Sequence, residues 1–207
     1  MLKKISFTSC VLLSLIGCAA ALVPYTNDPK QKIADAYWLF DEKYRALPAE
    51  KLLHEAIDIY KNNNDEAGLA DSYRAYAIFL RSRAVEKYSE RYKERGFIEK
   101  SITYKNRYLK SIEFLNKSKE YYLTKQKYDE LTNTYLHIGF TYAASNNLSE
   151  ACNAFNKSID ANKAFVEKNP KAKIQLDGYK SYKDYIGNLM RAAKCKRNQW
   201  DSIDPWL

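Results

Sequence analysis

The sequence predicts an all-α protein, and three observations support this fold class. Apolar residues recur with helical spacing along most of the chain, hydrophobic residues make up 46% of it, and only 6 of its 207 residues are glycine. That hydrophobic share is sufficient for a core, whereas so few glycines do not suit the many tight turns of a β-sandwich or a glycine-rich phosphate loop. The length fits one domain, with or without a tail.

Helical periodicity begins after residue 28 and continues almost to the end of the chain. Pro48 is typical of a helix start, Gly96 of a helix stop, and Asn169-Pro170 of a helix end. We expect helices over 29–45, 48–62, 65–82, 84–95, 104–124, 127–145, 148–168 and 179–195, a tether over 18–28 and a tail over 201–207.

The first seventeen residues have the organisation of an export signal. A short basic start, M-L-K-K, precedes a mostly apolar run over 5–16 that is too short to span a bilayer as a stable helix. The next residues, Leu15-Ile16-Gly17-Cys18, resemble the lipobox of bacterial lipoproteins. That resemblance implies cleavage before Cys18 and acylation of Cys18, which would anchor the chain to a membrane.

Ala19, in place of an aspartate, favours the outer membrane by analogy with enteric sorting rules, so we expect a lipid-anchored protein that faces the periplasm. The alternative is an ordinary signal peptide in which Cys18 is incidental. Removal of residues 1–17 takes away Lys3 and Lys4 and lowers the net charge from +9 to +7.

Cleavage would leave Cys152 and Cys195 as the thiols of the mature chain. An oxidising periplasm favours a disulfide between them, which would staple the C-terminal helix, and two buried free thiols are the alternative. His54 and His137 are isolated and no two cysteines lie close in sequence, so we expect no metal site and no cofactor.

Residues 132–158 carry a pattern of small and large residues on two consecutive helices. The first helix presents Tyr135, Ile138, Gly139 and Tyr142, and the second presents Ala151, Phe155 and Ser158. This pattern resembles a tetratricopeptide repeat, in which small residues let paired helices approach closely and large residues fill the gaps between them.

Related patterns lie upstream. A second copy consists of Tyr73, Tyr76, Ala77 and Leu80 followed by Ser111, Leu115 and Ser118, and an earlier one of Ile33, Tyr37 and Phe40 followed by Ala49, Leu53 and Ala56. Ala56 precedes Tyr73 by 17 residues and Ser118 precedes Tyr135 by 17, as in the roughly 40-residue variety of the family. The resemblance implies a tetratricopeptide-like solenoid of helical hairpins over 29–200, with 179–195 as a capping helix; an unrelated helical bundle is the alternative.

The second copy is interrupted by an insertion over about 82–104. Residues 81–110 hold ten Lys and Arg and four Glu, a net charge of +6. Three interpretations are open: a solvated extra helix, a protein interface, or attraction to anionic lipid headgroups or nucleic acid. Nucleic acid does not suit a periplasmic protein, and the residues of an interface here would be Tyr88, Arg91, Tyr92, Lys93 and Arg95.

In the family resembled here, residues of the first helix of each repeat line a concave groove. The corresponding positions are Asp71, Arg74, Ile78, Arg81, Asn133, Leu136 and Phe140. Some cytosolic relatives clamp a peptide carboxylate with Lys and Asn there, and this chain lacks that pattern. A groove with one charged and one apolar end suits an amphipathic peptide or helix.

No nucleophile elbow, zinc-protease motif or phosphate loop is present, so we expect a protein without enzymatic activity. The leading hypothesis is an outer-membrane-anchored scaffold or assembly factor that binds a protein partner in the cell envelope. The alternative is an immunity lipoprotein that inhibits a toxin delivered to the periplasm, and a hydrolase is a third, weaker hypothesis. The oligomeric state is open.

The lipobox hypothesis makes a direct prediction. Cys18→Ala removes the acyl acceptor, so the protein is expected to leave the outer-membrane fraction, as followed by immunoblotting of fractionated envelopes. Cys10→Ala is the control and should fractionate like the parent. Retention of Cys18→Ala in the outer membrane would contradict the hypothesis.

Overall fold

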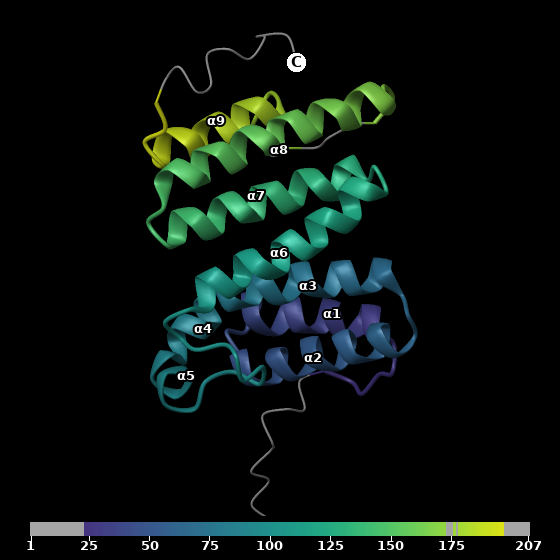
Figure 1. Cartoon of the computed structure of the whole chain (residues 1–207), viewed down its shortest axis with the longest axis vertical. Helices are drawn as coiled ribbons and strands as arrows, with labels where there is room; N and C mark the ends of the chain where they lie inside the picture. Colours follow the sequence, from purple (N-terminus) through teal and green to yellow (C-terminus); the bar gives the residue numbers. More distant parts are fainter. Residues whose placement is uncertain (1–22, 173–175, 177, 197–207) are drawn as a thin grey trace, which may run out of the picture.

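The computed structural model describes residues 23–172, 176 and 178–196, and in this part of the chain it is all-helical, without strands. The helices are stacked one above another along the long axis of the molecule, from α1 and α2 at one end to α8 and α9 at the other (Figure 1). Residues 1–22, with Cys18, and the tail over 201–207 lie outside the described residues.

The first helices follow the predicted order. Helix α1 (Pro29–Tyr37) continues into a π-helical turn, η1 (Trp38–Glu42), and α2 (Ala46–Asn62) and α3 (Glu66–Leu80) follow. Asp28 caps α1 by accepting a hydrogen bond from the Lys30 amide, and Asp65 caps α3 by accepting one from the Gly68 amide, each over 2.9 Å. Helix α2 begins two residues before Pro48, which places the proline in the first turn.

The insertion contains two short helices where the sequence predicted one. Helix α4 (Arg83–Lys87) and α5 (Ser89–Arg95) are separated at Tyr88, whose backbone leaves the helical region. Gly96 ends α5 with a φ of +66°, a conformation that glycine adopts without strain. Helix α4 packs against η1 and α3, so the insertion is attached to the first half of the stack.

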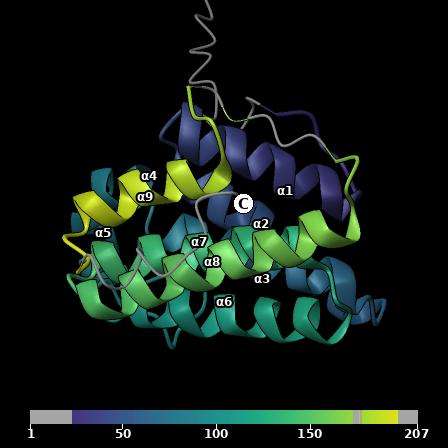
Figure 2. The same cartoon turned by 90° about the horizontal axis from the view of Figure 1, so that it is seen from above.

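The second half consists of four longer helices: α6 (Arg107–Thr124), α7 (Tyr128–Ala144), α8 (Leu148–Lys168) and α9 (Tyr182–Ala192). Helix α6 packs directly on α3 although the insertion separates the two in sequence, and α7, α8 and α9 each pack on the helix before. In the view along the long axis, α1 and α6 lie at opposite edges of the stack (Figure 2).

The same turn recurs between neighbouring helices. Tyr44, Asn64, Gln126 and Asn146 all have a φ between 52° and 61°, and each lies two residues before the next helix. After Asn64, Gln126 and Asn146, the next amide donates a hydrogen bond to the carbonyl five residues earlier, which is the Schellman arrangement at a helix end. The chain therefore makes these reversals without glycine, and this explains how so few glycines suffice.

Paired helices approach each other closely at small residues. The Ser118 hydroxyl on α6 donates a hydrogen bond of 2.5 Å to the Ala70 carbonyl on α3, and the Ser158 hydroxyl on α8 donates one of 2.7 Å to the Thr132 carbonyl on α7. Both serines are fully buried. Ala70 and Thr132 each lie three residues before a tyrosine of the sequence pattern, so equivalent positions of the two pairs make the same contact.

The described cysteines are bridged. Cys152 on α8 and Cys195, just after α9, form a disulfide with a Cα–Cα distance of 5.7 Å. The alternative of two free thiols does not hold in this structure. The bridge spans 43 residues of sequence and ties the chain just after α9 to the second turn of α8, in the same core cluster as buried Ile186 and Met190.

A substitution at Gly139 tests whether α7 and α8 approach each other closely. A Cβ at this position would lie 2.4 Å from the ring of Phe155, which is buried and has little room to move. Gly139→Ala should therefore lower the free energy of unfolding by about 1–3 kcal/mol, measured by chemical denaturation.

Gly187→Ala on α9 is the matched control, because its Cβ would meet only an arginine side chain at 3.9 Å. Alanine favours a helix over glycine by up to about 1 kcal/mol, so this variant should be as stable as the parent or more stable. Equal stability of the two variants would contradict the packing described.

Candidate functional site

Helices α3 and α7 face each other across the predicted groove, and polar contacts join them at two places. Near the start of α7, the Arg74 guanidinium binds the Glu130 carboxylate. Further along, Arg81 Nη2 lies 2.7 Å from His137 Nδ1. The two halves of the groove differ in kind, because the first is closed by ion pairs and the second opens into a cavity.

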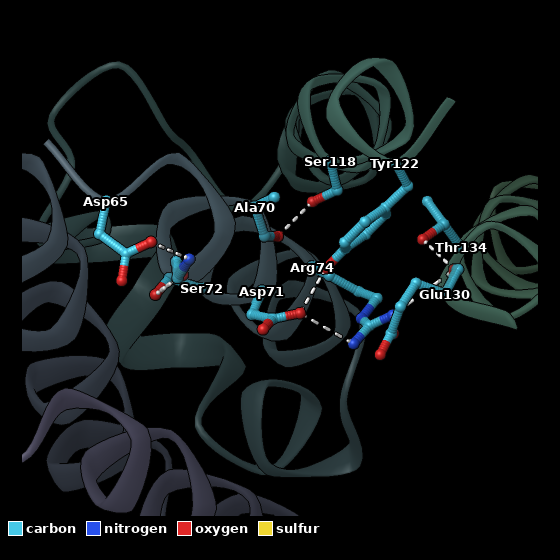
Figure 3. Close-up of polar contacts among 10 residues, drawn as sticks. Asp65, Ala70, Asp71, Ser72, Arg74, Ser118, Tyr122, Glu130 and Thr134 are labelled. Atoms are coloured by element: carbon cyan, nitrogen blue, oxygen red, sulfur yellow. Dashed lines mark hydrogen bonds and ion pairs between the residues drawn. The ribbon is translucent and has the colours of Figure 1, made fainter. Parts of the chain in front are cut away.

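The closed half is a network centred on Asp71 and Arg74 (Figure 3). Arg74 binds Asp71 over 3.2 Å as well as Glu130, and the Tyr122 hydroxyl on α6 donates to the same Asp71 carboxylate. The Arg74 guanidinium also lies 5.2 Å from the centre of the Tyr122 ring. These contacts join α3, α6 and α7, so the side chains of Asp71 and Arg74 hold these three helices together.

The open half is a cavity of about 500 Å³ where α1, η1, α3 and α7 meet. Its lining combines aromatic, charged and aliphatic side chains: Tyr37, Phe40, Asp41, Tyr44, Ile78, Arg81, Ser82, Arg83 and His137. Ile78 and Arg81 are the predicted groove residues that line it. The η1 residues were not predicted, because their sequence continues the periodicity of α1 and gives no signal for the π-helical turn.

The predicted groove residues on α7 have three different environments. Asn133 is exposed, and Phe140 lies under the Arg81 guanidinium, 5.3 Å from it, while packing against Phe155. The expectation for Leu136 was wrong: it is only 8% exposed and packs in the core with Phe155 and Tyr182. Helix α9 covers this face of α7 and α8, which the repeat pattern alone does not specify.

The expectation for Tyr92 in the insertion was also wrong. Its side chain is 1% exposed, stacks on Phe97 with ring centres 4.2 Å apart, and donates a hydrogen bond of 3.1 Å to Glu50. Tyr88 is half-buried against the same core, and Lys93 forms an ion pair with Glu90 over 2.6 Å. The exposed cations predicted for an interface are therefore reduced to Arg91 and Arg95 with Lys93 beside them.

Glu50 is a structural residue that the sequence analysis missed. This carboxylate is 2% exposed and accepts hydrogen bonds from Tyr92, from the Tyr76 hydroxyl at 3.4 Å, and from the Ile98 amide at 2.6 Å. Burial raises its pKa above the ordinary value for a glutamate. The available signal was its position next to Ala49 on the apolar face of α2, where a charged residue is out of place.

A second cluster of basic and aromatic residues lies where the insertion meets α6. Arg107 is nearly buried between the rings of Tyr104 and Tyr108, at 3.8 and 4.2 Å from their centres, and binds Glu86 over 2.5 Å. Both tyrosine hydroxyls also donate to Glu86. In this cluster, one arginine between two tyrosines holds the inserted segment against the start of α6.

Burial controls the charge of His137. Desolvation and the neighbouring guanidinium groups of Arg81 and Arg74 lower its pKa to about 3. The neutral ring can therefore accept a hydrogen bond from Arg81 at physiological pH. In the structure His137 has a hydrogen-bond partner, Arg81. In the sequence, His137 is isolated and nothing indicated this contact.

The described residues contain no cluster of three or more histidine, cysteine or acidic side chains arranged to hold a metal ion. None of the described helices is long and apolar enough to cross a membrane. No family model matches the chain, and comparison with curated proteins and with solved structures gave no significant match either.

His137 makes stability depend on pH. Between pH 6.5 and about 3 the unfolded chain protonates this histidine and the folded chain does not, so the free energy of unfolding falls as the pH is lowered through this range. From pH 7 to 5 the loss should be on the order of 1–2 kcal/mol. Denaturant titrations of the parent and of His137→Gln, whose amide oxygen can still accept from Arg81, measure the difference.

His54→Gln is the control for this experiment. Burial also lowers the pKa of His54, so this variant should lose its own contribution to the pH dependence and retain that of His137. The same slope of stability against pH in His137→Gln and in the parent would show that His137 does not titrate as described.

Proposed function

We propose that the chain is a lipid-anchored lipoprotein of the outer membrane whose helices form a tetratricopeptide-like solenoid that docks a protein partner in the periplasm. It acts as a scaffold or assembly factor and catalyses no reaction. The lipobox-like sequence that ends at Cys18 supports the anchor. The cavity where α1, η1, α3 and α7 meet is the observation that carries the docking function.

The recurrence of equivalent contacts supports the repeat proposal. The serine-to-carbonyl hydrogen bond is the same in the α3–α6 and α7–α8 pairs, and Asn64, Gln126 and Asn146 adopt the same turn. Such equivalence is expected of stacked copies of one supersecondary unit. Asn64 and Gln126 each lie nine residues before a tyrosine of the sequence pattern, Tyr73 and Tyr135, as stacked copies of one unit would place them.

The cavity supports docking because of its shape and its lining. Aromatic side chains, which are enriched in the energetically important parts of protein interfaces, form its walls, and Arg81 and Arg83 provide charge at one side. The adjacent insertion contributes a second surface through exposed Arg91 and Arg95. This surface lies on α5, which packs against α4, and α4 in turn packs against η1 and α3.

Chemical crosslinking in native envelopes, followed by purification of the chain, tests the proposal. We expect a specific protein partner that is lost when Arg91 and Arg95 are both changed to Glu, because charge reversal at an interface replaces attraction with repulsion. Reversal of Lys163 and Lys171, which are exposed on other parts of the chain, is the matched control and should leave the partner bound.

The identity of the partner separates the two functional hypotheses. An envelope assembly component favours the scaffold, whereas a delivered toxin whose activity the chain suppresses favours the immunity protein. Unchanged crosslinking of the Arg91 and Arg95 variant would remove the insertion from the interface. Failure to crosslink any protein would contradict the docking function itself.

A further inference from the structure

The guanidinium of Arg81 differs from those of the other partly buried arginines described above. Arg74 is paired with Asp71 and Glu130, and Arg107 is paired with Glu86. Among the described residues, no carboxylate lies within 4 Å of Arg81. Buried charges are normally paired with an opposite charge, and this half-buried arginine has no carboxylate partner among the described residues.

The hydrogen bonding of Arg81 is also incomplete. A guanidinium has five N–H donors, and the described residues accept from Arg81 at His137 alone. Its Nε is buried and has no hydrogen-bond partner. The contact with His137 and the Phe140 ring at 5.3 Å fix the plane of the group, so Arg81 is held in place at the wall of the cavity.

The charges around the cavity favour an anion. Arg83 is a second, exposed cation of the lining, Asp41 is its one carboxylate among the described residues, and His137 is neutral at physiological pH. Asp41 is itself exposed and forms no ion pair with either arginine. The planar fork of a guanidinium matches a carboxylate in a bidentate arrangement.

The other side chains that line the cavity favour an apolar group next to that anion. Tyr37, Phe40 and Tyr44 supply aromatic surface and Ile78 supplies aliphatic surface. A volume of about 500 Å³ can hold one or two side chains, so an apolar group next to the anion would be covered. A free inorganic anion would leave these walls without a contact.

We propose that this cavity binds a carboxylate of a partner protein, anchored by Arg81, together with an aromatic or aliphatic side chain that lies beside that carboxylate. The proposal rests on the docking function proposed above and specifies the chemistry of the segment that is bound. It differs from capture by Lys and Asn side chains, because one guanidinium and an aromatic wall provide the recognition.

Two small probes that differ only in charge test the proposal. N-acetyl-phenylalanine carries a carboxylate beside an aromatic ring, and N-acetyl-phenylalaninamide carries a neutral amide in its place. Each is titrated into the ¹⁵N-labelled full chain and followed by NMR. We expect the acid to shift the Arg81 Nε–H signal and the amides of 78–83 saturably, and to bind about tenfold more tightly than the amide, the equivalent of about 1.4 kcal/mol.

Variants locate the binding. Arg81→Met removes the charge and retains a similar length, so it should abolish the preference for the acid while circular dichroism shows an intact helical fold. Lys163→Gln, at an exposed position on α8, removes one positive charge away from the cavity, so it is the control and should bind the acid like the parent. Arg83→Gln gives a second measurement on the same cavity. It should weaken binding of the acid less than Arg81→Met does.

Three results would overturn the proposal: equal binding of acid and amide, undiminished binding of the acid by Arg81→Met, or tighter binding of inorganic phosphate than of the acid. These outcomes are distinct from failure of the docking function. If a protein is captured from the envelope but the two probes bind equally, the docking function stands and the carboxylate-binding site is contradicted. Selective binding of the acid without any crosslinked protein would support the carboxylate site and contradict the docking function.

Discussion

Close contact between paired helices at small residues is the constraint on which the rest of this structure depends. Ser118 reaches the Ala70 carbonyl and Ser158 reaches the Thr132 carbonyl only because the helix axes come near enough for a hydroxyl group to bridge the backbones. Gly139 lies under Phe155 for the same reason. Larger residues at these positions would separate the helices and leave voids between them, which close-packed interiors do not tolerate.

That constraint explains how the insertion is accommodated. Helix α6 returns to α3 as if residues 81–106 were absent, because the contact surface of the pair lies outside the inserted segment. The segment is then fixed by polar contacts to two carboxylates, buried Glu50 on α2 and exposed Glu86 on α4. Glu50 receives donors from α3, α5 and the following loop, and Glu86 receives Arg107 and two tyrosines. These carboxylates satisfy the buried donors of Tyr76, Tyr92 and Arg107, which would otherwise lack a charged partner.

Much of the fold could be predicted from the sequence, because periodicity, caps and the spacing of small residues are local signals. The helix boundaries mostly agree within two or three residues, except that 84–95 is divided at Tyr88 and η1 departs from the α-helix. The turns were harder to foresee. Tyr44 and Gln126 adopt a left-handed conformation that sequence reasoning assigns to glycine or asparagine, and tertiary packing outweighs that local preference.

The site was less predictable, because burial depends on which helix covers which face. Leu136 and Tyr92 occupy positions that are exposed on an isolated hairpin and become core once α9 and Phe97 cover them. Arg81 was identified as a groove residue, but no spacing rule distinguishes it from Arg74. The difference is that Glu130 lies within reach of Arg74, whereas a neutral histidine is the partner that Arg81 finds.

The measurement that tests the central claim most directly is the stability of a size series at Ser118. Ser118→Ala removes one hydrogen bond and should cost about 1 kcal/mol in the free energy of unfolding. Ser118→Leu forces extra volume between α3 and α6 and should cost about 1–3 kcal/mol more than alanine. A leucine variant as stable as the alanine variant would contradict the account, since it would mean that α3 and α6 are not in close contact at this position.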